Sequence, residues 1–177
     1  MKSILIAAAL LIGLTAAPAH AEVKATWAAG FRLEDRVTIA ASPEAVWEAL
    51  GRIGGWWDGA HSYSGDAANM TMPLRPGGCF CEALPGGGVK HGEVIMVLPG
   101  KALRIAAALG PLQEEGVSAA LTFTLTPAAD GGTEVVMTYN VGGARPEIVA
   151  IAPVVDGVVG GQLVRLKALV ETGAPTP

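Results

Sequence analysis

Hydrophobic and polar positions divide the chain after residue 68 into short segments that are separated by turn residues. Such segments predict β-strands, because alternate side chains of a strand point to opposite faces. The breaks include Pro76-Gly77, Gly86-Gly87-Gly88 and Asp130-Gly131-Gly132, which favour hairpins and therefore an antiparallel meander. The predicted strands cover residues 69–74, 78–84, 89–98, 102–109, 119–126 and 133–141.

The segment at 119–126 shows the clearest alternation. Leu121, Phe123 and Leu125 fall on one face of the predicted strand, and threonines occupy the positions between them. The next segment repeats this pattern with Val135, Met137 and Tyr139. One face of the sheet is therefore expected to be buried.

An extended segment beginning at Phe31 precedes a predicted helix. Ser42 is suited to cap the helix, Pro43 to occupy its first position, and Glu44 to stabilise its first turn. An apolar stripe follows at helical spacing, formed by Val46, Leu50 and Ile53 with Trp47 beside it. Gly54-Gly55 ends this helix, which must cover the sheet.

A second helical pattern occupies residues 147–170. Its apolar face comprises Ile148, Ile151, Val155, Val158, Val159, Leu163, Leu166 and Val170. Pro153 lacks a backbone donor, and glycines at positions 157, 160 and 161 each cost about 1 kcal/mol relative to alanine. We therefore expect a long C-terminal helix that is bent or starts late.

Residues 1–21 have the pattern of a secretory signal peptide. Lys2 provides a basic start, an apolar run occupies 4–14, and Ala19-His20-Ala21 is a small-x-small cleavage site. A membrane anchor is the competing interpretation, but the run is shorter than the ~20 residues that span a bilayer. We expect cleavage after Ala21, no membrane span in the mature domain at 22–177, and a periplasmic or secreted location.

The composition favours one domain with an apolar interior and argues against nucleic acid as a partner. The net charge is −4, and loss of Lys2 with the signal makes the mature chain more negative. Basic runs interleaved with aromatic residues are absent from the sequence. Charged residues make up 16% of the chain, against about 25% in ordinary domains. Apolar surface is thus available to line a cavity.

Five segments carry a resemblance to a known superfamily. They are VTIAASPEAVWEAL (37–50), GGWWDGAHSYSG (54–65), RPGGCFCEAL (75–84), GPLQ (110–113) and VDGVVGGQLVRLK (155–167). With the predicted order of elements, they resemble an exported bacterial branch of the START-like (SRPBCC) superfamily over residues 31–171. The resemblance implies an α+β helix-grip fold. In that fold a curved seven-stranded antiparallel sheet wraps around a long C-terminal helix, with two short helices after the first strand.

Members of this superfamily include lipid carriers, hormone receptors, polyketide cyclases and chaperone activators. The resemblance therefore implies a ligand-holding cavity but no particular reaction. We hypothesise an exported protein that binds an apolar or aromatic small molecule between sheet and C-terminal helix, without a cofactor or metal. The alternatives are an enzyme of polyketide cyclase/dehydratase type and a chaperone-like interaction module. Export argues against a cytosolic chaperone ATPase as the partner.

Aromatic residues after the first helix are the main candidates for ligand binding. Trp56 and Trp57 follow the Gly-Gly break, and we expect one ring to pack between helix and sheet and the other to line the cavity. His61 and Tyr63 lie on the next loop, where they either orient a ligand or face solvent; solvent exposure is favoured.

Two cysteines, Cys79 and Cys81, lie one residue apart on a predicted strand, so both thiols face the same side. Three interpretations fit: buried small residues, an oxidised pair that is easily reduced, or half of a metal site. An extended strand places their α-carbons about 6.6 Å apart, near the upper limit for a disulfide. Cys81 is included among the ligand-binding candidates.

His91 and Glu93 also lie on one face of a predicted strand. They are weak candidates for an acid–base pair if that face lines the cavity, whereas an exposed ion pair is the favoured alternative. Tyr139 is a third weak catalytic candidate. Glu82 and Gln113 either fix the orientation of a ligand or bond to the backbone of a loop, and Gln113 is retained as a binding candidate.

Several enzyme classes are excluded by missing motifs. Gly116-Val117-Ser118 lacks the second glycine of a nucleophile elbow, and the chain contains no His-Glu-x-x-His motif. Gly86-Gly87-Gly88 lacks the Lys-Ser/Thr that a phosphate-binding loop requires. Nucleotide chemistry is therefore not expected.

Overall fold

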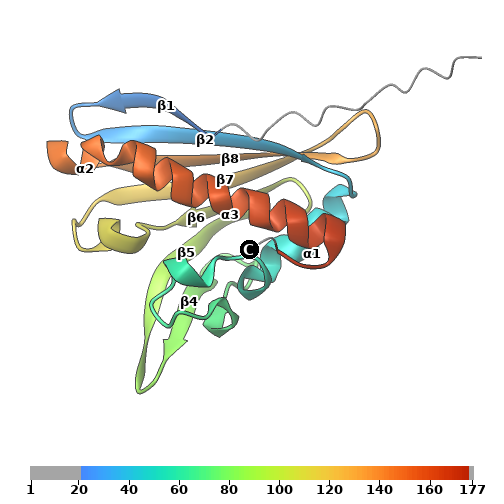
Figure 1. Ribbon diagram of the computed structural model, residues 1–177, viewed down its shortest axis with the longest axis horizontal. Coiled ribbons are helices and arrows are strands. Elements are labelled where there is room, and N and C mark those ends of the chain that lie inside the picture. Colours follow the sequence, from blue (N-terminus) through green and yellow to red (C-terminus); the bar gives the residue numbers. More distant parts are fainter. Residues whose placement is uncertain (1–20, 176–177) are drawn as a thin grey trace, which may run out of the picture.

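The computed structural model describes residues 21–175, which form an antiparallel sheet crossed by a long C-terminal helix (Figure 1). The strands are β1 (Ala21–Trp27), β2 (Gly30–Ile39), β3 (Met70–Thr71), β4 (Cys79–Leu84), β5 (Gly87–Leu98), β6 (Ala102–Ala106), β7 (Ser118–Pro127) and β8 (Thr133–Gly142). The helices are α1 (Pro43–Gly51), α2 (Pro146–Ala150) and α3 (Ala152–Thr172). The α+β class is as predicted. Apart from Ala21, the expected signal peptide at 1–21 lies outside the described residues.

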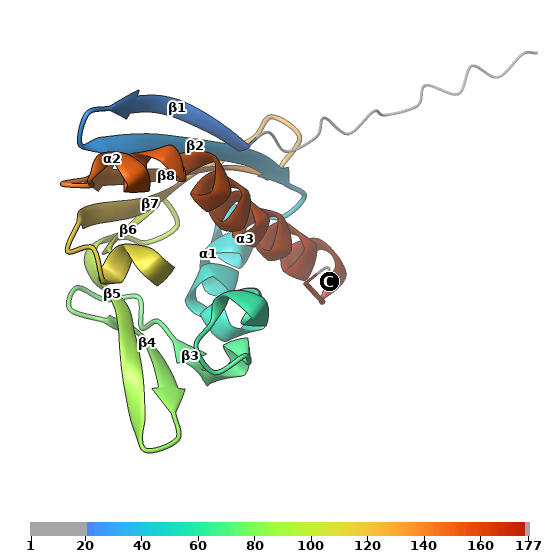
Figure 2. The ribbon, with the colours of Figure 1, turned by 60° about the vertical axis from the view of Figure 1, so that its left-hand side comes forward.

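All eight strands belong to one open sheet with the order β1-β2-β8-β7-β6-β5-β4-β3, and every neighbouring pair is antiparallel. The early strand β2 lies beside β8, the last strand, so the first and last parts of the strand sequence pair in the sheet. The hairpin of β4 and β5 extends away from α3, and the segment between α1 and β3 lies beside it (Figure 2).

One face of the sheet is buried, as the alternation predicts. Leu121, Phe123 and Leu125 of β7 are at most 4% exposed, whereas Thr124 and Thr126 are exposed. The register pairs these three apolar residues with Tyr139, Met137 and Val135 of β8, which are also buried. The two strands therefore present one continuous apolar surface to α3.

The sheet has eight strands, and the seven-strand prediction omitted β1. This edge strand pairs with β2, but most of its described side chains are exposed and only Val23 packs partly against the core. Little apolar alternation marks such a strand in the sequence. The segment predicted as a strand at 69–74 shortens to β3, because Pro73 lacks a backbone donor for a further ladder hydrogen bond.

Helix α1 begins as its capping residues predict. The Ser42 hydroxyl accepts a hydrogen bond from Ala45 N at 3.4 Å, and Pro43 occupies the first turn. Three 3-10 helices follow in place of the expected second short helix; they are η1 (Ile53–Gly55), η2 (Gly59–His61) and η3 (Ala67–Asn69). Since each spans a single turn, periodicity in the sequence does not reveal them.

The C-terminal helix is divided in the way that Pro153 predicts. Helix α2 ends at Ala150, and α3 starts at Ala152 with Pro153 in its first turn, where the missing N–H has no cost. Along α3, Val159, Leu163 and Leu166 are buried, and the helix packs on β1, β2 and α1. Gly173 closes α3 in the left-handed conformation, with φ of 83°.

Two carboxyl groups are buried between the sheet and α3. Asp35 of β2 is 4% exposed and Asp156 of α3 is 7% exposed. Within residues 21–175, Asp35 Oδ2 and Asp156 Oδ1 have no hydrogen-bond partner. Burial, the nearby charge of Asp156 and then that of Glu34 raise the pKa of Asp35 to about 7. Burial, followed by the charge of Glu22, also raises the pKa of Asp156.

The raised pKa of Asp35 predicts that stability decreases between about pH 4 and pH 7. In this window the folded protein keeps a proton that the unfolded chain releases, so the free energy of unfolding falls as the pH rises. Asp35→Asn removes this titration. The variant should be more stable than the wild type by about 1 to 3 kcal/mol at pH 8, with the difference vanishing near pH 4.

Urea denaturation at a series of pH values measures this difference. Glu48→Gln, on the exposed side of α1, is the control and should follow the wild-type pH profile. Parallel profiles for wild type and Asp35→Asn would contradict the assignment.

Candidate functional site

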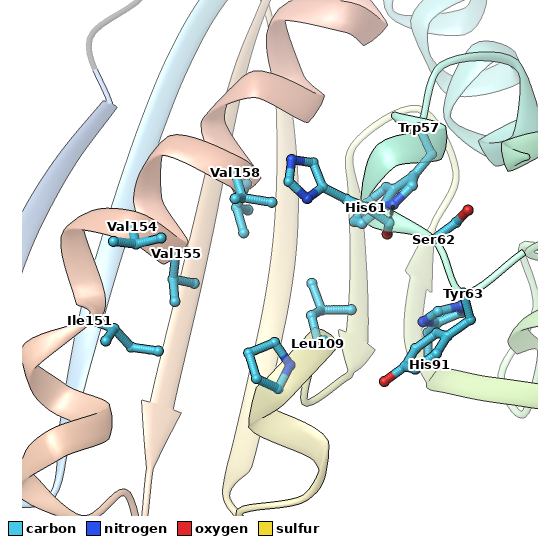
Figure 3. Close-up of a pocket in the computed structure, with 13 residues that line it drawn as sticks. Trp57, His61, Ser62, Tyr63, His91, Leu109, Ile151, Val154, Val155 and Val158 are labelled. Carbon is cyan, nitrogen blue, oxygen red and sulfur yellow. Dashed lines mark hydrogen bonds between the residues drawn. The ribbon is translucent and has the colours of Figure 1, made fainter. Parts of the chain in front are cut away.

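A cavity of about 410 Å³ lies between the first half of α3, the loop around η2, the segment before β7, and β5 (Figure 3). Its walls combine segments that are far apart in the sequence. The lining residues are Trp57, His61, Ser62, Tyr63, His91, Leu109, Gly110, Pro111, Ile151, Val154, Val155, Val158 and Val159.

Helix α3 and the residue before it supply one apolar wall. Val155, Val158 and Val159 recur at helical spacing and face the cavity, together with Ile151. Val154 also lines the cavity, although its side chain is 67% exposed, so it lies where the cavity opens to solvent. β-branched valines have few rotamers, and this wall is therefore stiff.

The opposite wall is the loop that contains η2. Trp57 is 5% exposed and its Nε1 donates a hydrogen bond to His61 O at 3.1 Å, which folds the loop back on itself. Asp58 N donates to Oε1 of the buried Gln162 at 2.7 Å, so the loop is tied to α3. The side chain of His61 points toward Val158 across the cavity (Figure 3).

His91 reaches the cavity because the pairing of β4 with β5 is irregular. Phe80 pairs with Gly92 and Cys81 with Lys90, which leaves His91 as an extra residue in a β-bulge. Consequently both His91 and Gly92 are buried. A Cβ atom at Gly92 would lie 2.6 Å from the Ala107 side chain, so the close approach of β5 to this segment requires glycine.

Glu82 is the polar centre beside the cavity. Its two carboxylate oxygens accept hydrogen bonds from Tyr63 N at 3.0 Å, Ser64 N at 2.5 Å and His91 Nε2 at 2.9 Å. Burial alone would raise the pKa of Glu82, but these hydrogen bonds outweigh it and lower the pKa to about 2. Glu82 is therefore a carboxylate at neutral pH.

The structure places three of the six predicted ligand-binding residues in the cavity wall: Trp57, His61 and Tyr63. Trp56 is fully buried elsewhere in the core, where its Nε1 donates to Ala49 O at 3.1 Å and its ring packs edge-on against Phe123. One tryptophan thus lines the cavity while the other packs between helix and sheet.

Cys81 and Gln113 do not line the cavity. Cys81 forms a disulfide with Cys79, with α-carbons 5.2 Å apart, on the face of β4 opposite the buried Phe80 and Glu82. Because side chains alternate along the strand, both sulfurs point away from the cavity. The disulfide also decides among the three interpretations of this pair: the cysteines are neither free thiols nor metal ligands. Gln113 donates from Nε2 to Lys90 O at 2.8 Å, so its amide joins a loop to the backbone of β5.

His91 and Glu93 do not form the acid–base pair that was considered for them. The bulge reverses the alternation after His91, and Glu93 instead forms an exposed ion pair with Lys90 at 2.6 Å. Glu82, which the sequence indicated only as a ligand-orienting or loop-bonding residue, takes the place beside His91. Glu82 lies two residues after Phe80 on the same strand, and this spacing alone indicated that its side chain faces inward. The β-bulge that aligns Glu82 with His91 is not recognisable in the sequence.

Tyr139 has a structural role and does not line the cavity. Its hydroxyl donates to Ala107 O at 2.9 Å and accepts from Leu109 N at 3.0 Å. Burial raises the pKa of this phenol. Tyr139 therefore holds the segment that carries Leu109 into the cavity wall.

A family model described as polyketide cyclase / dehydrase and lipid transport matches residues 30–171, from β2 to the last turn of α3. The chain belongs to this family. Membership agrees with the resemblance of the sequence to the START-like (SRPBCC) superfamily, and the family binds hydrophobic ligands. No curated protein is a significant match.

Solved structures share the fold of this chain. A conserved protein of unknown function from Enterococcus faecalis has a TM-score of 0.60 and 17% identity, covering 90% of this chain and 80% of its own. The Aha1 dimer from Colwellia psychrerythraea has a TM-score of 0.55 and 21% identity, covering 80% and 97%. DynU16, a protein of the dynemicin biosynthetic locus, has a TM-score of 0.56 and 22% identity, covering 81% and 48%.

At these identities the similarities establish the fold alone, and this chain spans about half the length of DynU16.

Among residues 21–175, none of the helices combines the length and apolar character that a membrane crossing requires. In the same part of the chain, His, Cys, Asp and Glu residues form no group of three or more suited to hold a metal ion.

A structural role for Tyr139 predicts a loss of stability in Tyr139→Phe. Removing the hydroxyl leaves Ala107 O and Leu109 N without these buried hydrogen bonds, which should lower the free energy of unfolding by about 1 to 3 kcal/mol. Urea denaturation measures the loss. Tyr63→Phe is the matched control, because Tyr63 is 53% exposed, and it should change stability little. Equal stability of both variants would rule out this role.

Proposed function

We propose that the protein is an exported binding protein for an apolar or aromatic small molecule, which it holds in the cavity between the sheet and α3. The observation that carries the proposal is the cavity of about 410 Å³, which falls within the roughly 300–1,000 Å³ common for small-molecule sites. Export rests on the signal pattern at residues 1–21.

The chemistry of the walls supports an apolar ligand. Aliphatic side chains of α3 and Leu109 face the ring of Trp57 and the loop that follows it. A flat ring system placed between them would gain contact with stiff aliphatic groups on one side and aromatic groups on the other. The few polar groups, such as His61 and His91, are then available to orient the ligand.

An enzyme of polyketide cyclase/dehydratase type is the second candidate. One observation favours it: a buried carboxylate, Glu82, is hydrogen-bonded to an imidazole, His91, at the cavity wall. A carboxylate that orients a histidine is a common arrangement for acid–base chemistry. A chaperone-like module gains no comparable support, because the similarity to Aha1 concerns the fold alone.

Val158→Phe tests whether the cavity is the binding site. Val158 lines the cavity, and a phenyl ring at this position would occupy space that the ligand needs. The probe is 2-methoxynaphthalene, an apolar aromatic molecule. The wild type should bind it, and Val158→Phe should bind it with an affinity at least roughly tenfold lower, because the added ring excludes the probe. Isothermal titration calorimetry or quenching of tryptophan fluorescence gives the two dissociation constants.

Val164→Phe is the control, since Val164 lies on the same helix, is 39% exposed and does not line the cavity. This variant should bind the probe as the wild type does. The proposal fails if the folded wild type does not bind the probe, or if both variants bind it as tightly as the wild type.

A further inference from the structure

We propose that His91 gives the cavity a fixed hydrogen-bond acceptor, which selects apolar ring compounds that carry a phenolic or enolic hydroxyl group. The accepting atom is Nδ1 of His91. This inference rests on the proposed function, because it names the class of ligand for the same cavity. It assigns to the site a polar specificity that its aliphatic walls cannot provide.

The carboxylate of Glu82 determines which nitrogen of His91 carries hydrogen. Glu82 accepts hydrogen bonds from two backbone N–H groups of the neighbouring loop and from His91 Nε2. An ionised carboxylate only accepts, so the hydrogen of the neutral imidazole must lie on Nε2. Nδ1 is then left with a lone pair and no hydrogen.

Packing determines the orientation of the imidazole. The ring packs against Phe80, at a centroid distance of 4.9 Å, and against Tyr63, at 5.8 Å. His91 itself is 5% exposed and is the extra residue of the β-bulge, so its backbone directs it inward. With the Glu82 hydrogen bond, these two ring contacts restrain the orientation of the imidazole.

Nδ1 is the edge of the ring that remains open. Within residues 21–175, this atom has no hydrogen-bond partner, and it is not among the fully enclosed side-chain atoms that lack one. His91 lines the cavity, and we infer that its unenclosed Nδ1 is the ring atom that faces it. Figure 3 shows Tyr63 and His91 on the side opposite the valines of α3.

The surroundings of this acceptor define the ligand. A purely apolar molecule that displaces water from Nδ1 leaves a buried acceptor unsatisfied, which opposes binding. A molecule whose hydroxyl donates to Nδ1 avoids this cost, and its ring contacts Leu109 and the valines of α3. Phenols and enols are suited to this position, because their hydroxyl groups are stronger donors than those of aliphatic alcohols.

Two probes of nearly equal shape test the inference. 2-Naphthol carries the hydroxyl donor, and in 2-methoxynaphthalene a methyl group replaces the hydrogen. Calorimetry on the purified protein at pH 7.5 should show tighter binding of 2-naphthol by roughly three- to tenfold, the range that one hydrogen bond provides.

Two substitutions of His91 distinguish the roles of its two ring nitrogens. In His91→Gln, the amide nitrogen can replace Nε2 and donate to Glu82, but the position of Nδ1 is lost. The preference for 2-naphthol should therefore disappear while the loop stays anchored. In His91→Asn, the shorter amide places its oxygen near the position of Nδ1, so a preference should persist although the bond to Glu82 is lost.

Imidazole ¹⁵N NMR of the wild type reports the tautomer directly, with hydrogen expected on Nε2. Glu82→Gln removes the carboxylate that holds hydrogen on Nε2, so the share of the tautomer with hydrogen on Nδ1 should rise and the preference for 2-naphthol should fall. A role confined to structural support would leave this preference unchanged in both Glu82→Gln and His91→Gln.

The outcomes distinguish this inference from the proposed function. If Val158→Phe weakens both probes but the wild type binds them equally, the cavity binds ligands and the inference is overturned. Loss of the preference in His61→Gln and not in His91→Gln would also overturn it, since His61 is the other imidazole in the cavity wall. If neither probe binds, the proposed function itself fails.

Discussion

The carboxylate of Glu82 is the constraint on which the candidate site depends. It joins three segments of the chain: its own strand β4, His91 on β5, and the backbone of the loop at Tyr63 and Ser64. A charged group is stable in this buried position only because donors surround it. The same hydrogen bonds that lower its pKa also place the loop opposite α3. The electrostatics of one side chain therefore set the shape of the cavity.

The other side of the cavity depends on how the C-terminal helix begins. Pro153 separates α2 from α3, and the first turns of α3 then bring their valines to the cavity wall. Gln162 connects the two walls through its hydrogen bond from Asp58 N. Tyr139 positions Leu109 in the same way through hydrogen bonds from the interior of the sheet. Each wall is thus held by a buried polar group that is satisfied by backbone atoms.

The pKa values of Asp35 and Asp156 are shifted in the direction opposite to that of Glu82. Each is buried with one carboxyl oxygen that has no partner in the described residues, so burial raises the pKa of both groups, whereas hydrogen bonds lower that of Glu82. Carboxyl groups between the sheet and α3 therefore oppose folding at neutral pH, while the carboxyl group beside the cavity supports it. Hydrogen bonds offset the burial of Glu82, whereas within the described part of the chain none offsets the burial of Asp35 or Asp156.

The sequence by itself determined the six strands after the first helix, the cap at Ser42 and the break at Pro153, because these depend on neighbours within a few residues. The fold class followed from the resemblance of the sequence to a known superfamily. Edge strand β1 was not predicted, because an exposed strand shows little alternation of hydrophobic and polar residues. Sequence also identified Trp57, His61, Tyr63 and His91 as chemically suited side chains. Only the tertiary structure decided which of them meet. One extra residue in β5 turned His91 inward and Glu93 outward, and the pairing of β4 with β5 brought Glu82 to the imidazole. Such a shift in register arises from contacts between strands, which no local pattern of residues records.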